Sequence, residues 1–248
     1  MTFAPDFDRA IVVPSPNFGE RKGVSKPDML VLHYTAMETA KAACDWLCAE
    51  EAEVSAHYLV DENGEISQLV AEEKRAWHAG QSSWHGEVDI NSRSIGIEVA
   101  NQGHEAGCPI YPDVQMQSVI GLSRSIIARH NIDPKRVLAH SDIAPLRKRD
   151  PGEWFSWKAL ADQGVGHYVD PSPISGGRYF MRGESGQPIE ALQSMLGLYG
   201  YGLEVNGQFD ELTEAVIIAF QRHFRPEKVD GIADMSTIET LHRLLAEN

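Results

Sequence analysis

The sequence lacks the features that mark an exported or membrane-spanning protein. It contains no run of about 18 apolar residues, the length that a helix needs to cross a bilayer. Residues 1–23 carry early acidic side chains and no apolar core of an export signal. We therefore expect a cytoplasmic chain with no membrane span. The alternative is a periplasmic or cell-envelope protein from which a signal has been removed.

Positive charge is also scarce. The chain has 22 Lys and Arg residues against 36 Asp and Glu residues, a formal net charge of −14. This balance argues against broad binding to the phosphate backbone, so no nucleic-acid partner is expected. Arg147, Lys148 and Arg149 are therefore a local basic island in an acidic chain, which favours a role at one specific site.

Cysteine is rare as well. The three cysteines are Cys44 and Cys48, one helical turn apart, and Cys108 in a loop rich in Gly and Pro. This spacing matches neither a Cys-x-x-Cys metal pair nor a disulfide framework. We expect buried or idle thiols, because free cysteine behaves as a small hydrophobic residue.

The patterns that are present alternate between strand and helix. Apolar, β-branched runs predict strands, a hairpin is expected at Asn63-Gly64, and helical periodicity separates the strands. These patterns predict an α/β fold with a mixed central sheet flanked by helices. The expected strands cover 28–36, 94–101 and 136–140, the hairpin 55–70, and the helices 38–53, 114–131 and 154–164.

A change in composition predicts a second domain. Residues 1–165 are expected to form the first domain, with about 25 irregular residues leading into it, and 166–182 a linker rich in Gly, Pro and Ser. Residues 183–248 show three short helical patterns, which predict a small three-helix domain. Its two loops, VNGQFD and RPEKVDGIAD, resemble each other.

Two histidines and an aspartate are candidates for a metal site. His33 and His140 each end an expected strand, and Asp150 follows a loop that contains proline. Two neutral imidazoles and a carboxylate suit catalytic zinc, with the fourth position left for water. The alternative is that His33 and His140 are separate strand-end histidines with hydrogen bonds of their own.

Glu98 and Lys148 are candidates for the accompanying chemistry. Glu98 lies in the apolar strand SIGIEV, where a carboxylate is costly to bury unless it is paired or functional. Desolvation would bring its pKa nearer to neutrality, as a general base or acid needs, although nearby zinc would oppose this shift. Lys148 precedes Asp150 by two residues, so an extended backbone would point both side chains the same way. The alternatives are a strand-edge Glu98 and a surface Lys148, both facing water.

Together these residues resemble a known family, the zinc-dependent N-acetylmuramoyl-L-alanine amidases. The resemblance covers roughly residues 25–165 and rests on several separate blocks in order: LHYTA, SAHYLV, RAWHAG, SIGIEVAN, HSDIAPLRKRDPG and WKAL. The C-terminal part resembles a three-helix peptidoglycan-binding domain in LQSMLGLYGYG, FDELTEAVIIAFQRHFRP and DGIADMST. The family shares its fold with peptidoglycan-recognition proteins.

The resemblance implies a role for each candidate residue. It implies one zinc ion held by His33, His140 and Asp150, Glu98 as the catalytic carboxylate and Lys148 as the cation that stabilises the intermediate. It also implies that Trp77 and His78 wall the substrate groove, although simple packing is the alternative for both. His57 is expected to be a hydrogen-bonded core histidine and no ligand, and the sequence offers no partner for the remaining histidines: His85, His104, His130, His167, His223 and His242.

The implied activity is hydrolysis of the amide between N-acetylmuramic acid, or its 1,6-anhydro form, and L-alanine of the stem peptide. The implied partner is peptidoglycan or a muropeptide, in cell-wall turnover or muropeptide recycling, and the chain is expected to be a monomer. The alternative is a recognition protein that binds without cutting. Such proteins commonly lack a metal ligand, whereas the full set is present here. The C-terminal domain would contact substrate or only pack on the catalytic domain.

Overall fold

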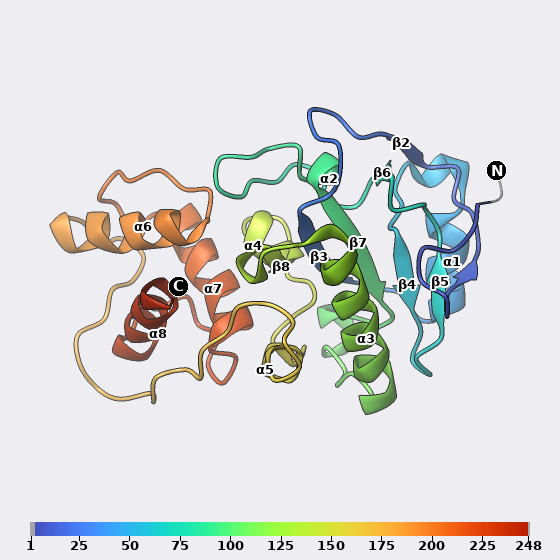
Figure 1. Ribbon diagram of the computed structural model, residues 1–248. Helices are drawn as coiled ribbons and strands as arrows, with labels where there is room; N and C mark the ends of the chain where they lie inside the picture. The colour runs from blue at the N-terminus through green and yellow to red at the C-terminus, as the bar shows by residue number, and fades with distance from the viewer. Residues whose placement is uncertain (1–2, 248) are drawn as a thin grey trace.

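The computed structural model describes residues 3–247. Its central sheet has six strands in the order β1-β5-β4-β7-β3-β8, and β2 and β6 form a separate pair (Figure 1). Strands β4, β7, β3 and β8 run parallel, whereas β4 and β5 form an antiparallel hairpin. The predicted mixed sheet is confirmed. The strands are β1 (Ile11–Val12), β2 (Phe18–Glu20), β3 (Met29–Tyr34), β4 (Tyr58–Val60), β5 (Ile66–Gln68), β6 (Lys74–Ala76), β7 (Ser94–Val99) and β8 (Val137–Ala139).

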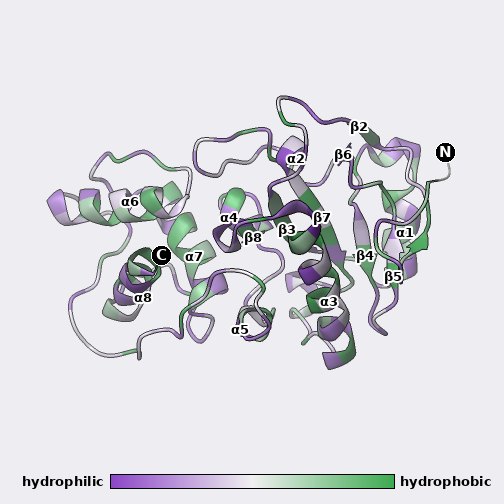
Figure 2. Ribbon diagram, viewed as in Figure 1, coloured by the Kyte–Doolittle hydropathy of each residue, from purple (hydrophilic) through white to green (hydrophobic). Residues whose placement is uncertain are grey.

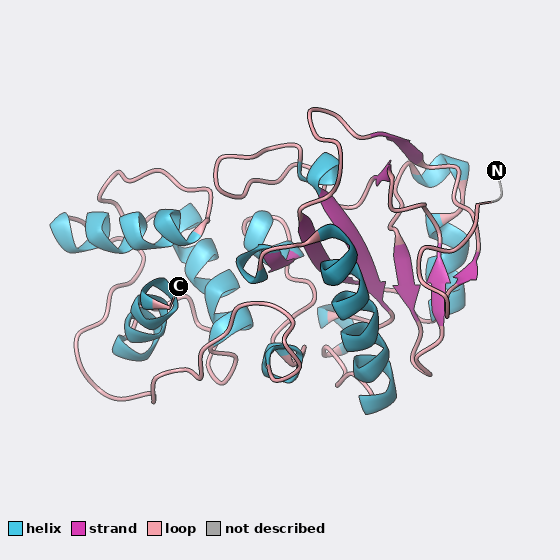
Figure 3. Ribbon diagram, in the orientation of Figure 1, coloured by secondary structure: helices cyan, strands magenta, loops and turns pink. Residues whose placement is uncertain are grey.

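Helices cover this sheet and continue beyond it (Figure 3). Polar side chains begin several of them; for example, the Thr39 hydroxyl accepts a hydrogen bond from the Ala42 amide at the start of α1. The α-helices are α1 (Ala40–Leu47), α2 (Ile90–Arg93), α3 (Asp113–His130), α4 (His140–Ile143), α5 (Trp157–Ala161), α6 (Gln187–Tyr199), α7 (Glu211–Phe224) and α8 (Met235–Ala246). Short 3₁₀ turns lie at Glu50–Ala52, His104–Ala106 and Pro134–Arg136.

The N-terminal lead-in is more regular than the sequence predicts. Strand β1 pairs in parallel with β5, and β2 pairs with β6. The expectation of an irregular lead-in is therefore wrong for these residues. The strands have only two and three residues, too few to show a period. Their partners lie more than 50 residues further along the chain, so local sequence does not reveal the pairing.

Alternation along the strands separates the two faces of the sheet. Leu30 and Leu32 of β3 pack with Ile95 and Ile97 of β7 in a core that also contains the apolar face of α3. The intervening residues Met29, Val31 and His33 therefore point to the opposite face. Figure 2 shows the strands as mainly hydrophobic ribbons, with polar residues toward the outside of α3.

The C-terminal region is helical, as predicted, and uses the same capping and loop contacts before α7 and before α8. Asp210 caps α7 and Asp234 caps α8, each through a hydrogen bond of 2.8 Å from the amide of a threonine three residues on. The Gln193 amide bridges the loop before α7, and the Gln221 amide bridges the loop before α8 in the same way. These contacts explain the similarity of the two loop sequences.

The C-terminal helices share a hydrophobic core with the N-terminal region. Met29, Val31, Leu138 and Ile143 belong to the same buried cluster as Phe220 and other side chains of α6, α7 and α8. The C-terminal region therefore packs against the N-terminal half, on the sheet face opposite α3. The boundaries predicted at residues 165 and 183 stay predictions.

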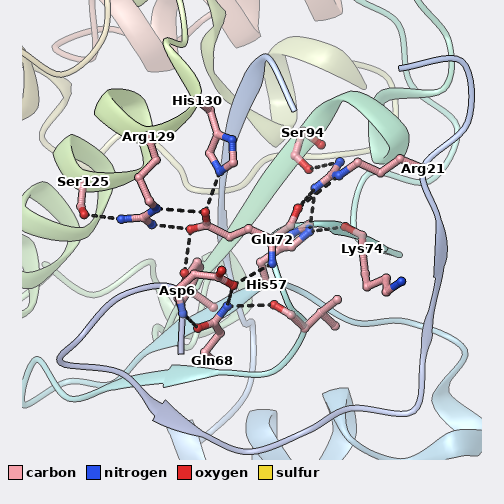
Figure 4. A network of polar contacts seen from close by, with 12 residues as sticks. Asp6, Arg21, His57, Gln68, Glu72, Lys74, Ser94, Ser125, Arg129 and His130 are labelled. Atoms are coloured by element: carbon pink, nitrogen blue, oxygen red, sulfur yellow. Dashed lines mark hydrogen bonds and ion pairs between the residues drawn. The ribbon is translucent and has the colours of Figure 1, made fainter. Parts of the chain in front are cut away.

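A buried network ties the end of α3 to the sheet (Figure 4). The Glu72 carboxylate accepts hydrogen bonds from the Tyr58 hydroxyl, the Arg129 guanidinium and the His130 ring. Burial alone would raise the pKa of Glu72, but the hydrogen bonds from His130, Arg129 and Tyr58 outweigh it and lower the pKa to about 2. Three donors thus meet the Glu72 carboxylate, an arrangement typical of a structural network.

Two further expectations concern membrane-spanning helices and the state of the cysteines. Within residues 3–247, no helix is both long and apolar enough to span a bilayer. Cys44, Cys48 and Cys108 are free thiols, and Cys108 is buried.

Candidate metal centre and active site

Neighbouring parallel strands bring the candidate residues together at the carboxyl ends of β7, β3 and β8. His33 lies next to the end of β3 and pairs in register with Glu98 of β7. On the other side of β3, β8 ends at Ala139 and α4 begins with His140. The loop after α4 then returns, and the Ser141 amide donates a hydrogen bond of 3.0 Å to the Asp150 carbonyl.

His33, His140 and Asp150 form a buried cluster. The Nδ1 atoms of the two histidines lie 2.9 Å apart, and Asp150 Oδ2 lies 3.1 Å from His33 Nδ1 and 2.9 Å from His140 Nδ1. All three ligand atoms lie within 4.8 Å of one another, an arrangement that can hold a metal ion. The alternative of two separate strand-end histidines is wrong.

Hydrogen bonds on the far side of His33 fix which ring nitrogen carries the proton. The Ser94 hydroxyl donates to the Ile90 carbonyl, at 2.7 Å, and accepts from His78 Nε2, at 3.1 Å. His78 Nδ1 therefore accepts the proton of His33 Nε2, at 2.9 Å. This chain leaves a lone pair on His33 Nδ1, the atom that faces the cluster.

His140 is oriented in the same way. Its Nε2 donates to the Ala79 carbonyl at 3.0 Å, so its Nδ1 also keeps a lone pair for the cluster. Arg147 donates to the Ala79 carbonyl as well, and to that of Gln81. Arg147 is thus a scaffold residue of this loop.

The electrostatic environment keeps His33 and Asp150 in their metal-binding forms. Burial and the neighbouring His140 lower the pKa of His33 to about 4. Burial would raise the pKa of Asp150, but the charge and hydrogen bonds of His140 and His33 hold it well below its usual range. The His33 imidazole is therefore neutral and the Asp150 carboxylate ionised at neutral pH, and imidazole and carboxylate donors fit zinc.

Glu98 lies beside this cluster with an unusual environment. Strand β7 is flanked by β3 and β4, so Glu98 is not on a strand edge. Among residues 3–247, no side chain or backbone group donates to its buried Oε2. Burial, followed by the charge of Asp150, raises the pKa of Glu98 well above its usual value, and the Lys148 ammonium opposes this shift.

Lys148 and the predicted aromatic residues line the same cavity. The cavity has a volume of about 290 Å³, and Trp77, His78, Glu98 and Lys148 contribute to its walls. His78 also lies over β7, where Gly96 leaves it room: a Cβ at Gly96 would come within 2.6 Å of its ring. The sequence missed further lining residues, of which Met37 precedes α1 and Ala43, Trp46 and Leu47 lie on it.

The other histidines lie outside the cluster. His57 is buried, and its Nδ1 accepts from the Gly96 amide at 3.0 Å, as expected of a core histidine. Four histidines for which the sequence offers no partner do have partners: His104 pairs with Glu153, His130 with Glu72, His167 with Tyr199 and His223 with Asp142.

Comparison with known protein families agrees with this geometry. Residues 23–153 match the family described as N-acetylmuramoyl-L-alanine amidase. The chain belongs to the N-acetylmuramoyl-L-alanine amidase family. Residues 185–241 match a peptidoglycan binding domain. The protein is therefore an amidase with a C-terminal domain of this type.

Individual relatives cover both regions or the first alone. The N-acetylmuramoyl-L-alanine amidase AmiD of Escherichia coli is 38% identical over 88% of this chain and 82% of its own. The 1,6-anhydro-N-acetylmuramyl-L-alanine amidase AmpD of the same species is 35% identical over 58% of this chain and 86% of its own.

Two solved structures resemble the whole fold. A structure of E. coli AmiD, in complex with the substrate anhydro-N-acetylmuramic acid-L-Ala-D-gamma-Glu-L-Lys, has a TM-score of 0.76 and 35% identity and covers 93% of this chain and 98% of its own. AmpDH3 from Pseudomonas aeruginosa, in complex with anhydromuramic pentapeptide, has a TM-score of 0.71 and 30% identity, over 93% of this chain and 96% of its own.

Proposed function

We propose that this amidase uses zinc to hydrolyse the bond between the lactyl group of N-acetylmuramic acid, or of its 1,6-anhydro form, and L-alanine of the stem peptide. The observation that carries this proposal is the convergence of three ligand atoms, on His33, His140 and Asp150, of which His140 and Asp150 line the same cavity as the Glu98 carboxylate. The substrates named for AmiD and AmpDH3 support the choice of a muropeptide.

His33, His140 and Asp150 would hold the ion beside the cavity that His140, Asp150 and Glu98 line. Zinc bound there supplies a Lewis acid that polarises a carbonyl group and makes water nucleophilic near neutral pH. His78 and Ala79 keep the Nδ1 atoms of His33 and His140 unprotonated, so both remain available as ligands.

Glu98 and Lys148 would perform the proton and charge steps. Glu98 takes a proton from the attacking water as the new C–O bond forms, and it gives this proton to the stem-peptide nitrogen as the C–N bond breaks. A carboxylate with a raised pKa is suited to both transfers. The Lys148 ammonium stabilises the negative charge that develops on the carbonyl oxygen. Trp77, half-buried in the cavity wall, is placed to contact the substrate.

The test uses the full chain stripped of metal with a chelator and then reconstituted with zinc. We expect about one zinc per chain, release of free stem peptide from soluble anhydro-muropeptide or from intact sacculi, and loss of this activity in phenanthroline or EDTA. Activity that survives complete metal removal would overturn the proposal. Binding of muropeptide without any release of peptide would support the recognition protein instead.

The relative rates on the two substrates decide the biological substrate class. A preference for soluble anhydro-muropeptide indicates recycling, whereas a preference for sacculi indicates wall turnover. The preference is measured as kcat/KM for each substrate under the same zinc concentration.

A further inference from the structure

Helix α7 of the C-terminal region reaches the metal-binding loop with two consecutive side chains. His223 is buried, and its Nδ1 donates a hydrogen bond of 2.7 Å to Asp142 Oδ2. Its ring also stacks on Trp157 of the catalytic half, with the ring centroids 3.8 Å apart. The two consecutive residues are Arg222 and His223, in the segment FQRHF. The proposed chemistry makes no use of them.

Asp142 transmits this contact to a metal ligand. It lies on the single turn of α4 that begins with His140, and its Oδ2 also accepts from the Ala139 amide at 2.8 Å. Its Oδ1 accepts from the Tyr201 hydroxyl at 2.8 Å. A buried carboxylate thus joins the Ala139 amide, next to His140, to two side chains of the C-terminal region.

The preceding residue, Arg222, acts at the other end of the loop. Its Nε lies 3.4 Å from Oε2 of Glu153, three residues beyond Asp150, as an ion pair without hydrogen-bond geometry. The same oxygen accepts from His104 Nε2 at 3.0 Å, and His104 Nδ1 accepts from the Tyr34 hydroxyl at 2.9 Å. Tyr34 follows His33 and lines the catalytic cavity.

We propose that Arg222 and His223 are positioning residues that hold both ends of the 140–153 loop and so fix the spacing of His140 and Asp150. The C-terminal region is then part of the scaffold of the metal centre, in addition to any contact with the cell wall. This inference rests on the proposed use of His33, His140 and Asp150 as metal ligands.

The fixed spacing matters because the loop contributes two of three ligands. Within residues 3–247, one backbone hydrogen bond joins the two ligand positions directly: the Ser141 amide donates to the Asp150 carbonyl at 3.0 Å. Groups that orient metal ligands from behind typically change metal affinity by about 10–100-fold when removed. Because His223 acts through Asp142, we expect an effect near the lower end, about 10-fold.

The experiment compares full-length His223→Ala, His223→Asn and His167→Ala with the unchanged chain. Asparagine keeps an N–H group near the position of Nδ1. His167 is the control: its Nδ1 contacts the Tyr199 hydroxyl of α6 at 3.0 Å and, within residues 3–247, neither Asp142 nor Glu153. Zinc affinity of the metal-free proteins is measured by competition with a chromophoric chelator, together with thermal unfolding, kcat and KM on soluble muropeptide.

We expect His223→Ala to weaken zinc binding about 10-fold and to lower kcat with little change in KM. His223→Asn should restore the affinity to within about 2-fold, and His167→Ala should leave it unchanged whatever its effect on unfolding. Arg222→Ala should weaken zinc binding as well, in a chain that keeps the His223 contact. Unchanged zinc affinity in His223→Ala, or equal losses in His223→Ala and His167→Ala, would overturn the inference.

Two further outcomes separate this inference from the proposed function. If His223→Ala does not fold, Tyr201→Phe takes its place, because this change removes only the hydroxyl that donates to Asp142. Its zinc affinity is then compared with that of the unchanged chain. Unchanged zinc affinity in Tyr201→Phe counts against the inference. If the unchanged chain binds no zinc, the proposed function fails and the inference with it. Zinc binding by the unchanged chain with no effect of the α7 variants overturns the inference alone.

Discussion

Two buried polar clusters on opposite faces of the central sheet use similar residues in different ways. On the α3 face, Glu72 accepts from Arg129, His130 and Tyr58, so that each acceptor meets a donor. On the other face, the lone pairs of His33, His140 and Asp150 converge on one another, and Glu98 beside them has an oxygen for which residues 3–247 provide no donor.

The difference separates a network that stabilises the fold from an arrangement that can hold a metal ion. Balanced donors and acceptors stabilise a fold, whereas converging acceptors next to a cavity are the arrangement that a divalent cation needs. Substitutions in the first cluster should therefore alter stability, and substitutions in the second should alter zinc binding or turnover.

The largest effect is expected for Asp150→Ala, which removes a ligand. Zinc binding and peptide release should both fall below detection, because two imidazoles remain where three ligands are needed. Metal analysis and a peptide-release assay measure the result, with circular dichroism as the check on folding. A folded Asp150→Ala protein with activity within about 10-fold of the unchanged chain would contradict the assignment.

Glu98→Gln should separate catalysis from metal binding. We expect kcat to fall by about 10²–10⁴, the usual contribution of general acid–base catalysis. Zinc should stay bound, and stability should not decrease, because the change removes a carboxylate whose charge is costly to bury. Steady-state kinetics, zinc content and denaturant unfolding test the three expectations. Normal turnover with zinc bound would show that Glu98 is not the catalytic carboxylate.

Lys148→Ala should leave measurable activity. Loss of one group that stabilises the oxyanion typically lowers kcat by about 10²–10³. Arg149→Ala, at the exposed neighbouring position, is the matched control and should change kcat little. Equal kcat losses in both variants would mean that the basic island acts through its overall charge and that Lys148 has no specific role.

Glu72→Gln should alter stability and spare catalysis. Its lowered pKa stabilises the folded state above the unfolded value of about 4.5, and this contribution is lost as pH falls through about 2. The variant should lose on the order of 3 kcal/mol of unfolding free energy at pH 7, and the difference should shrink between pH 4.5 and 2.

Denaturant unfolding at pH 7 and pH 3 measures this change, with exposed Glu62→Gln as the control. Activity per folded Glu72→Gln molecule should match that of the unchanged chain. A loss of stability that stays constant across this pH range would show that the charge of Glu72 is not its source.

Local sequence predicted most of the regular structure. The strand containing His33, the strand containing Glu98 and the hairpin at Asn63-Gly64 were all confirmed, because alternation and turn chemistry are properties of neighbouring residues. The fold class and the amidase family were confirmed as well. The roles assigned to Glu98, Lys148, Trp77 and His78 stay predictions, as do the compartment and the monomeric state.

What the sequence by itself determined was therefore the order of the main strands and helices and the amidase family. Only the tertiary structure decided which polar groups meet: His130 with Glu72 across 58 residues, and His223 with Asp142 across 81. Such pairs depend on how helices pack on the two faces of the sheet, and no periodicity along the chain records that packing. For the same reason, the placement of α7 behind the metal loop became visible only in three dimensions.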